Sequence, residues 1–297
     1  MDADQFSLQP LDRRQLEILV QWAATEGWNP GPHDAAAFYA ADPDGYHGFF
    51  HEGRLIAGGA IVSYERQFGF MGLFIVHPDY RGRGLGQRLW HLRRDALLQR
   101  LQPDATIGMD GVVAMQPFYQ AGGFELAFTS NRYECRARAL PVSAAVSPVT
   151  AADWPEIFSY DETTVGYPRS SFLTAWLQLP DSCAFQLRRQ GLLHGFAVLR
   201  KVAAGYKIGP LFCDSVEGAE TLYRCCLNAA ARQTESDVTA ENRASVFLDV
   251  PCVNQNALDM VGRYEPRYVF ECGRMYHGTP PAQRLQNVYG VTTFELG

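Results

Sequence analysis

The sequence lacks long apolar runs, basic clusters and a leader-like start. No uninterrupted apolar stretch approaches the ~18 residues of a membrane-spanning helix, and the opening MDADQFSLQP has neither the basic nor the apolar region of a secretory signal. Lys and Arg number 26 against 32 Asp and Glu, which gives a formal net charge of −6. A protein that binds nucleic acid needs a sustained basic face for the phosphates. We therefore expect a protein that is neither secreted nor bound to a membrane or to nucleic acid.

Cysteine is scattered, and no Cys-x-x-Cys pair occurs. The seven cysteines, an odd number that lies mostly in apolar stretches, are Cys135, Cys183, Cys213, Cys225, Cys226, Cys252 and Cys272. This pattern favours reduced thiols in a cytoplasmic protein over a disulfide framework or a metal site. A composition of 47% hydrophobic, 12% aromatic and 20% charged residues is typical of a globular protein with ample core. A length of 297 residues predicts about two domains.

The first half predicts a helix, a hairpin and a strand-turn-helix unit. Asp12 with Gln15 is typical of a helix N-cap, and apolar residues at helical spacing follow up to about Gly27. GYHGFFHEGRLIAGGAIVSYE has aromatic and β-branched residues on both sides of a Glu-Gly-Arg turn, which predicts an antiparallel hairpin. A strand over 70–76 then leads through a glycine-rich turn into a helix that Pro103 ends. A strand (TIGMDGVV), a short helix and a returning strand (GGFELAFTSNRYE) complete this half.

A small, proline-containing segment, RALPVSAAVSPVT, follows the first half. It is almost free of charge, which is typical of a connection between domains. We therefore expect one domain at 1–138, a linker at 139–149 and a second domain at 150–297.

The second half looks like a diverged copy of the first. GPLFCDSVEGAETLYRCCLNAA repeats the strand, turn and helix of GLFIVHPDYRGRGLGQRLWHLRRDAL. FLDVPCVNQNALDMVGRYEPRYVFECGRMY mirrors IGMDGVVAMQPFYQAGGFELAFTSNRY, with Asp249 for Asp110 and Arg274 for Arg132. Any two α/β halves can be aligned loosely, but three features in the same order favour a duplication. The second turn, over 214–218, has no arginine and one glycine, so we expect it to have lost the chemistry of the first.

The turn in VHPDYRGRGLGQRLW has the features of a phosphate site. It joins a strand to the first turn of a helix, where unpaired backbone N–H groups and the positive end of the helix dipole converge. The sequence is not a Walker loop, which needs Gly-Lys-Ser/Thr, and no acidic ribose partner on a second parallel strand marks a dinucleotide fold. The alternative is that Gly82, Gly84 and Gly86 only permit a tight corner.

The spacing Arg-x-x-Gly-x-Gly after a Val-x-Pro strand end resembles the acyl-CoA signature of the GCN5-related N-acetyltransferase (GNAT) family, met here by Arg81, Gly84 and Gly86. The resemblance implies an α/β (α+β) fold with a mixed, mostly antiparallel sheet flanked by helices. It also implies that the strand before the turn splays from its neighbour at a bulge, so that free backbone groups hold the pantetheine arm and one N–H polarises the thioester carbonyl. The implied residues for binding acetyl-CoA are Phe74, Ile75, Val76, Arg81, Gly82, Arg83, Gly84, Leu85, Gly86 and Gln87.

A second family motif, Tyr-x-x-x-Gly-Phe, is met by Tyr119, Gly123 and Phe124. In GNAT enzymes this tyrosine commonly protonates the departing CoA thiolate, a step that suits a phenol because the thiol it creates is only slightly more acidic. The alternative is an aromatic side chain packed between helix and sheet. The chain departs from the family at Val112, where an Asn often precedes the tyrosine by two helical turns.

Two carboxylates are candidates for the base that an amine nucleophile needs. Asp110 lies on the strand next to the predicted pantetheine site, and Glu65 ends the hairpin. Glu65 can equally be a solvated strand end, and Asp110 a carboxylate satisfied by backbone N–H groups. We favour Asp110, because a charge between TIGM and GVV is hard to solvate and should have a partner. Tyr119 and Asp110 are thus the predicted catalytic residues.

The acceptor is expected on the face opposite CoA, near the first helix and the loop after it. The candidate walls, from EGWNPGPHDAAAFY, are Trp28, Asn29, His33, Asp34, Phe38 and Tyr39. The second domain offers Asp161, Arg169, Trp176, Lys207, Asp249 and Arg274 to close the pocket. These side chains can instead form internal ion pairs or an interface. Without a phosphate turn of its own, the second domain is expected to bind no CoA.

Longer stretches resemble a set of paired acetyltransferase-like proteins, in which a GNAT domain precedes a domain of the YitH type. They are EGWNPG, GMDGVVAMQ, KIGPLF, RMYHG and GVTTFELG. The resemblance implies two tandem GNAT-like domains, with acetyl-CoA bound by the one at 1–138 and a degenerate copy at 150–297. It names no substrate.

Together these features predict an acetyl-CoA-dependent N-acetyltransferase without a metal. The amine of a small-molecule or amino-acid-like acceptor would attack the thioester directly in a ternary complex. The alternative is a non-catalytic protein that binds or senses acyl-CoA. A phosphate-binding module for another nucleotide is a third possibility, although no ribose or base signal supports it. The acceptor, the acyl-chain preference and the oligomeric state are left open by the sequence.

Overall fold

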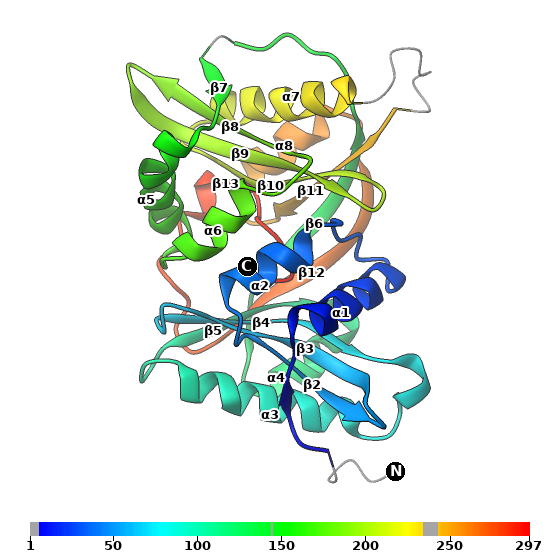
Figure 1. The fold of residues 1–297 in the computed structure, drawn as a ribbon. Helices are drawn as coiled ribbons and strands as arrows, with labels where there is room; N and C mark the ends of the chain where they lie inside the picture. Colours follow the sequence, from blue (N-terminus) through cyan, green and yellow to red (C-terminus); the bar gives the residue numbers. More distant parts are fainter. Residues whose placement is uncertain (1–5, 144, 234–242) are drawn as a thin grey trace.

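The computed structural model of the chain describes residues 6–143, 145–233 and 243–297, so residue 144 of the expected linker lies outside it. Two halves lie one above the other (Figure 1). The elements of the first half are β1 (Gln9–Pro10), α1 (Arg13–Thr25), α2 (Asp34–Ala41), β2 (Tyr46–His51), β3 (Arg54–Tyr64), β4 (Phe68–Val76), α3 (Leu85–Arg100), β5 (Thr106–Val112), α4 (Gln116–Ala121) and β6 (Glu125–Arg136). Those of the second half are β7 (Val146–Pro148), α5 (Trp154–Val165), α6 (Ser170–Leu177), β8 (Ser182–Arg189), β9 (Leu192–Val202), β10 (Gly205–Cys213), α7 (Val216–Arg232), β11 (Ser245–Pro251), α8 (Gln255–Gly262), β12 (Arg267–His277) and β13 (Val288–Gly290).

The local elements expected of the first half are confirmed. Asp12 accepts a hydrogen bond from the backbone N–H of Gln15, and the Gln15 side chain accepts one from the N–H of Asp12, both at 2.8 Å. This capping box begins α1. The hairpin of β2 and β3 turns at Gly53, whose φ of +75° favours glycine. The expected linker contains the short strand β7, which pairs with β8.

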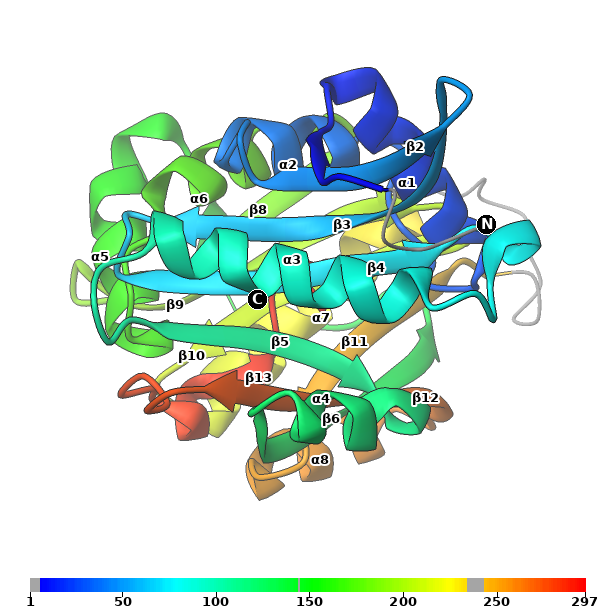
Figure 2. The same ribbon diagram turned by 90° about the horizontal axis from the view of Figure 1, so that it is seen from below.

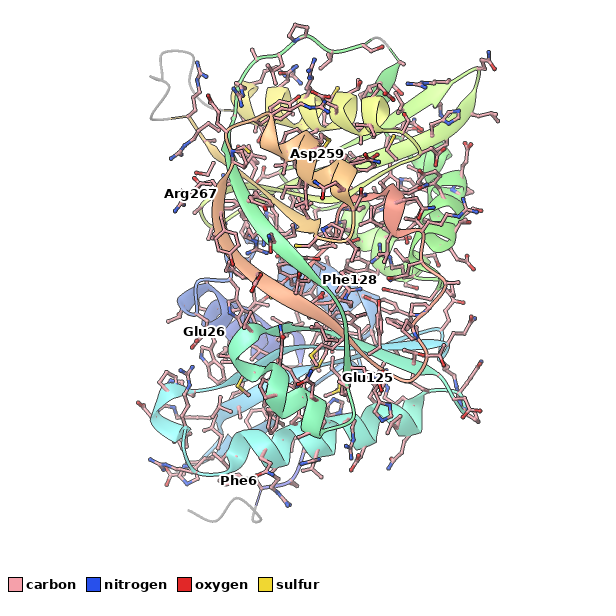
Figure 3. The ribbon with its side chains drawn as sticks, turned by 180° about the vertical axis from the view of Figure 1, so that it is seen from behind. Phe6, Glu26, Glu125, Phe128, Asp259 and Arg267 are labelled. Atoms are coloured by element: carbon pink, nitrogen blue, oxygen red, sulfur yellow. The ribbon has the colours of Figure 1, made fainter. Side chains whose placement is uncertain are left out.

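The described strands form one continuous, mostly antiparallel sheet in the order β1-β2-β3-β4-β5-β12-β6-β11-β10-β9-β8-β7, with β13 paired to β10. At its centre the halves exchange strands. β12 of the second half pairs with β5 of the first, β6 of the first half pairs with β11 of the second, and β6 and β12 pair with each other. In Figure 3, β6 rises from Glu125 and Phe128 in one half, while β12 descends from Arg267 in the other. Each half therefore completes the sheet of the other.

Two buried ion pairs repeat this exchange. Asp110 on β5 lies opposite Arg274 on β12, and Asp249 on β11 lies opposite Arg132 on β6. Each pair is bidentate, with N–O distances of 2.8 Å in the first and 2.6 and 2.7 Å in the second. Each aspartate is therefore neutralised by an arginine on the strand that comes from the other half. This reciprocity agrees with the duplication expected from the sequence.

The helices cover the sheet and fill the space between the halves. α3 packs against β3 and β4 on the outer side of the first half (Figure 2). α1 and α2 lie between the two halves (Figure 1), where Phe38 of α2 stacks on Trp176 of α6 with ring centroids 6.1 Å apart. α7 covers β8, β9 and β10. In the part of the chain that the model describes, no helix has the length and apolar character needed to cross a membrane.

Candidate active site

The site begins where β4 and β5 separate. These parallel strands pair only from Phe68 and Thr106 to Phe70 and Gly108. Just beyond, the β3–β4 register shifts between its partners Gly58–Ile75 and Ala60–Gly72, so that two β4 residues face one on β3. One of the two, Leu73, has a φ of +48°. A left-handed conformation is strained in a leucine, and strain of this kind is kept where the fold over-determines it. The predicted splay and bulge are both present.

A cavity of about 500 Å³ opens in this splay. On one side it is lined by Met71, Gly72, Leu73, Phe74, Ile75 and Val76 of β4. On the other side it is lined by Met109, Asp110 and Val112 of β5, with Met115 and Tyr119 beyond. Beyond Phe70, the backbone N–H and C=O groups of β4 that face away from β3 pair with no strand that the structure describes, because the β4–β5 pairing ends at Phe70 and Gly108. An extended amide-containing ligand can pair with such groups in the way that an added strand does.

Arg93 of α3 holds the bulge from behind. Its Nη2 group donates to the carbonyl oxygens of Ala60 and Gly72, the latter at 2.9 Å, one from each strand. The guanidinium is fully buried, lies 5.4 Å from the ring centroid of Phe74, and has no carboxylate partner among the described residues. Burial lowers the pKa of Arg93 to about 9. No local motif singles out this arginine, because its role depends on two strands distant from it in sequence.

The glycine turn presents backbone donors. Gly82 and Gly84 have φ values of +72° and +75°, and a Cβ on Gly82 would meet no atom within 4 Å. Gly84 is the N-cap of α3, and no side chain caps this helix. The first N–H groups of α3 are therefore free to bind an anion, and the positive end of the helix dipole favours one. The backbone of this turn fits the pyrophosphate of a CoA molecule.

The arginines of the turn have different surroundings. Arg81 donates from Nε to the carbonyl oxygen of Val76 at 2.9 Å and forms an ion pair with Glu26, at the end of α1 (Figure 3). It therefore braces the end of β4. Arg83 is exposed, with its guanidinium 5.5 Å from the ring centroid of Tyr80. It lines a second cavity, of about 220 Å³, beside the turn.

The predicted acetyl-CoA residues divide between the cavity and its rim. Those that line the main cavity are Phe74, Ile75, Val76, Arg81, Gly82 and Gly86. Arg83, Gly84, Leu85 and Gln87 lie outside this lining, on the turn and the first residues of α3. If CoA binds as the sequence predicts, its pyrophosphate would lie at the turn and its pantetheine arm along β4.

Tyr119 of α4 reaches the cavity from the β5 side. The residue is 6% exposed, and no described residue hydrogen-bonds its hydroxyl. Burial raises the pKa of Tyr119 to about 12, against an opposing effect of Arg93. The phenol is therefore protonated at neutral pH and can act as a hydrogen-bond and proton donor in the cavity.

Asp110 has the partner that its position in the sheet predicts. Both of its oxygens accept from Arg274 at 2.8 Å. Burial raises the pKa of Asp110, and Arg274 opposes that rise. Asp110 lines the cavity, but a role as base would compete with the ion pair. Glu65, the other candidate, is exposed in the turn after β3 and does not line the cavity.

The far end of the cavity is built from both halves. Its lining there is Trp28, Arg132, Phe270, Cys272, Phe294 and Glu295. Trp28 is the one residue of the expected acceptor walls that reaches the cavity. Asp34 instead forms a buried ion pair with Arg200 at 2.8 Å, and Asn29 bonds the backbone of Ala204. Phe294 and Glu295 belong to the GVTTFELG stretch noted in the sequence. Their position at the cavity depends on packing against residues that are distant in the chain.

The second-half residues considered for the pocket lie mostly in internal contacts. Asp161 accepts both bonds of a buried ion pair with Arg169, at 2.7 Å, and Trp176 donates to the carbonyl of Gly209 at 2.8 Å. Asp249 and Arg274 belong to the exchanged pairs of the sheet. The interpretation as internal ion pairs therefore holds for the four charged residues Asp161, Arg169, Asp249 and Arg274, whereas Lys207 is buried and forms no ion pair with a described residue.

In the second half, the groove that corresponds to the β4–β5 splay is filled by the chain itself. β10 and β11 run parallel from Tyr206 to Ile208, and β10 then has an irregular register with β9. Beyond that point β13 pairs with β10, and the N–H of Val291 donates to the carbonyl of Asp249 at 2.9 Å. The following helix, α7, is capped by Ser215. In the described part of this half, β13 fills the splay and Ser215 caps the helix, so neither is open to a CoA molecule. We therefore still predict that the second half binds no CoA.

Comparisons with known proteins place both halves in one family. Residues 13–124 match the acetyltransferase (GNAT) family, and residues 157–290 match an acetyltransferase (GNAT) domain. The chain is a tandem GNAT protein. Its paired architecture, expected from the sequence, is confirmed. In the described part of this tandem GNAT protein, no group of His, Cys, Asp and Glu side chains is arranged to hold a metal ion.

Known relatives span nearly the whole tandem GNAT chain. It is 24% identical over 289 residues to the holothin acyltransferase of Pseudoalteromonas sp. (strain SANK 73390), covering 97% of this chain and 93% of that protein. Its fold is similar to a putative acetyltransferase from Pyrococcus horikoshii, with a TM-score of 0.80, 20% identity and coverage of 98% and 96%. A tandem GNAT protein from the clavulanic acid biosynthesis pathway is also similar, with a TM-score of 0.63, 14% identity and coverage of 94% and 100%.

Proposed function

We propose that this tandem GNAT protein transfers an acetyl group from acetyl-CoA to the amine of a small-molecule or amino-acid-like acceptor, by direct attack in a ternary complex in the cytoplasm. The observation that supports this most strongly is the continuous path from the glycine turn, along the unpaired edge of β4, to Tyr119. One cavity thus combines an anion site, a strand edge for amides and a proton donor. A GNAT relative that is named an acyltransferase and covers almost the whole chain supports the class of reaction.

The chain's own groups would bind and orient the donor as follows. Backbone N–H groups of residues 82–87 hold the pyrophosphate, with Arg83 beside them. Residues 74–76 pair with the amides of the pantetheine arm, so backbone conformation matters more there than side-chain identity. Arg93 fixes that conformation by tying Ala60 to Gly72 across the bulge.

The chemistry then needs an electrophile, an acid and a base. A backbone N–H at 74–76 donates to the thioester oxygen, where negative charge develops during attack. As the C–N bond forms and the C–S bond breaks, Tyr119 gives its proton to the departing thiolate. The amine nitrogen loses protons to a base near the attack site, for which Asp110 is the candidate from the sequence. To take a proton, Asp110 would have to weaken its bidentate ion pair with Arg274, which costs free energy.

The decisive assay is the release of free CoA from acetyl-CoA across a panel of amines, amino acids, polyamines and peptides, with an Arg83→Glu protein as control. Acceptor-dependent release that disappears in the control is the expected result, because a carboxylate beside the turn repels the phosphates. Unchanged release with Arg83→Glu would contradict the position proposed for the pyrophosphate.

A non-catalytic acyl-CoA sensor is the second candidate. It is favoured by the ion pair of Asp110, because both oxygens of that carboxylate already accept hydrogen bonds from Arg274. The two candidates differ in a Tyr119→Phe protein. An enzyme would lose turnover and keep its affinity for acetyl-CoA, whereas a sensor would have no turnover to lose.

A further inference from the structure

Three acids line the main cavity, and one of them forms no close ion pair with a described residue. Glu26 is paired with Arg81, and Asp110 is paired with Arg274. The third, Glu295, forms no ion pair within 4.0 Å among the described residues. Its Oε2 accepts from the hydroxyl of Thr293, while no described group bonds Oε1. In this carboxylate, which is 4% exposed, Oε1 is left to accept a hydrogen bond from water or from a ligand in the cavity.

The segment that carries Glu295 lies directly against the β4 bulge. A Cβ on Gly72 would be 1.9 Å from the carbonyl oxygen of Glu295, so only glycine allows this approach. Upstream, Val291 is bonded to β11, and Thr292 accepts from Arg169 at 2.7 Å. Downstream, Arg169 also donates to the carbonyl oxygen of Gly297 at 2.6 Å, so the segment is fixed on both sides of Glu295. It brings a carboxylate beside the strand edge where the thioester is expected.

The surroundings keep this carboxylate charged. Although burial opposes the effect, three nearby cations lower the pKa of the Glu295 carboxyl. They are Lys207, Arg132 and Arg200. Lys207 is itself buried and also forms no ion pair within 4.0 Å among the described residues. An ionised Glu295 at neutral pH attracts a cationic group that enters the cavity.

The side chains that line the cavity also restrict which groups such a ligand can carry besides its cation. Trp28, Phe270 and Phe294 give the far end flat aromatic surfaces. The cations in the lining are Arg81 and Arg132, and both are occupied. Arg132 donates from Nε and Nη2 to Asp249 and from Nη1 to the carbonyl of Trp28. Among the described residues that line the cavity, Glu295 thus offers one free anionic oxygen and neither arginine is free; the nearby Lys207 lies outside the lining, so a carboxylate or phosphate on the ligand is disfavoured.

We propose that Glu295 binds the ammonium group of the acceptor and takes its first proton, and that the acceptor is a small amine with a planar apolar body and no anionic group. The inference rests on the proposed function, and it narrows the amino-acid-like acceptors expected from the sequence. The ammonium passes one proton through Glu295 to water; because the pKa of the Glu295 carboxyl is lowered, Glu295 does not keep that proton. The neutral nitrogen forms the C–N bond as the C–S bond breaks. A second nitrogen proton replaces the one that Tyr119 gives to the thiolate, and the third remains on the amide.

A binding experiment tests this without requiring turnover. Phenethylamine is titrated by calorimetry into the full chain saturated with CoA, and phenylalanine, which adds only a carboxylate, serves as the matched ligand. We expect phenylalanine to bind at least about tenfold more weakly, and Glu295→Gln to weaken phenethylamine by about tenfold or more, because a charge-assisted hydrogen bond becomes a neutral one. Glu65→Gln, an exposed acid outside the cavity, is the control and should bind like the wild type.

Turnover supplies the second readout. With phenethylamine and acetyl-CoA, Glu295→Gln should lower kcat by about 10²-fold or more while the Kd for acetyl-CoA stays unchanged. Equal phenethylamine affinity in wild type and Glu295→Gln, or phenylalanine binding as tightly as phenethylamine, would overturn the inference. So would a wild-type chain that binds neither ligand. If phenethylamine binds through Glu295 but no acetyl transfer occurs, Glu295 stands as the binding group for the ammonium, while its role as base and the proposed enzyme activity fail.

Discussion

Tyr119 and Asp110 lie on the same side of one cavity, but their environments differ in a way that decides what each can do. Both are buried, and burial raises both pKa values. Tyr119 keeps a hydroxyl with no partner among the described residues, whereas both oxygens of Asp110 are held by Arg274. The tyrosine can therefore transfer a proton at no cost in ion pairing. The main role of the aspartate is therefore structural, as the partner of Arg274 in the ion pair that joins β5 to β12.

Tyr119→Phe is expected to lower kcat by about 10²- to 10⁴-fold, the range for loss of a positioned general acid. The affinity for acetyl-CoA should stay the same, because the ring and its packing are kept. Since burial raises the pKa of Tyr119 to about 12, the wild-type acid should remain protonated from about pH 8 to about pH 10, and no alkaline loss of rate should arise from it there. Steady-state kinetics over that range check both points. A Phe variant with wild-type kcat would leave Tyr119 as a packing residue.

Which of these residues the sequence reveals depends on how local their signal is. Tyr119 belongs to a short motif, and the partner of Asp110 was expected because a charge in a sheet centre needs one. Arg93 has no such signal, and the GVTTFELG stretch that contains Glu295 assigns it no role. Each is a charged residue whose surroundings come from strands far away in sequence, so burial without an ion pair cannot be inferred from its neighbours in the chain.

At the level of elements, the bulge in β4 and the segment 291–297 depend on each other. Arg93 bonds the carbonyl of Gly72 from one side, and the carbonyl of Glu295 packs against Gly72 from the other. The same segment begins in β13, which fills the groove of the second half. One stretch of chain thus closes one GNAT groove and builds a wall of the other.

Gly72→Ala should be damaging out of proportion to its size, because the new Cβ would overlap the backbone of Glu295 at 1.9 Å. We expect a loss of about 1–3 kcal/mol in the free energy of unfolding, as for overpacked cores, together with loss of acceptor-dependent turnover. Gly58→Ala is the matched control in β3, since its Cβ would approach no atom closer than 3.4 Å. Denaturant unfolding compares the two. Equal stability would mean that the segment 291–297 does not pack on the bulge.

Some secondary-structure elements can be predicted from the sequence, and others cannot. The capping box, the hairpin, the glycine turn and the splay all have local or motif signals, and all are present. The exchange of β6 and β12 has no such signal in the sequence. Each strand would show the same alternation of side chains whether it joined its own half or the other one. The β13 strand is three residues long and lies in a groove that only the folded second half creates.

For the whole molecule, the shared strands make two sequence domains into one sheet. β6 and β12 are paired along most of their length, and the exchanged ion pairs lie on either side of them. The 1–138 and 150–297 boundaries divide the chain by sequence similarity, but each half contributes a strand to the other. We propose that the halves fold and unfold together.

Asp249→Asn tests this cooperativity. The change leaves Arg132 buried without its carboxylate, which costs about 3–5 kcal/mol for a buried pair. Thermal unfolding should remain a single transition at a lower Tm, because the pair joins β6 of one half to β11 of the other. Asp259→Asn, on the exposed side of α8 (Figure 3), is the control and should be nearly neutral. Two separate transitions, or equal stability of the two variants, would contradict the account.

The most direct test of the central claim is a calorimetric titration of acetyl-CoA into the whole chain and its Arg83→Glu variant. We predict one binding site per chain, because the first half has an open splay and an uncapped helix while β13 and Ser215 close the second. That single site should be lost with Arg83→Glu. Two sites per chain, or one site that Arg83→Glu leaves intact, would contradict the assignment of the donor to the β4–β5 splay.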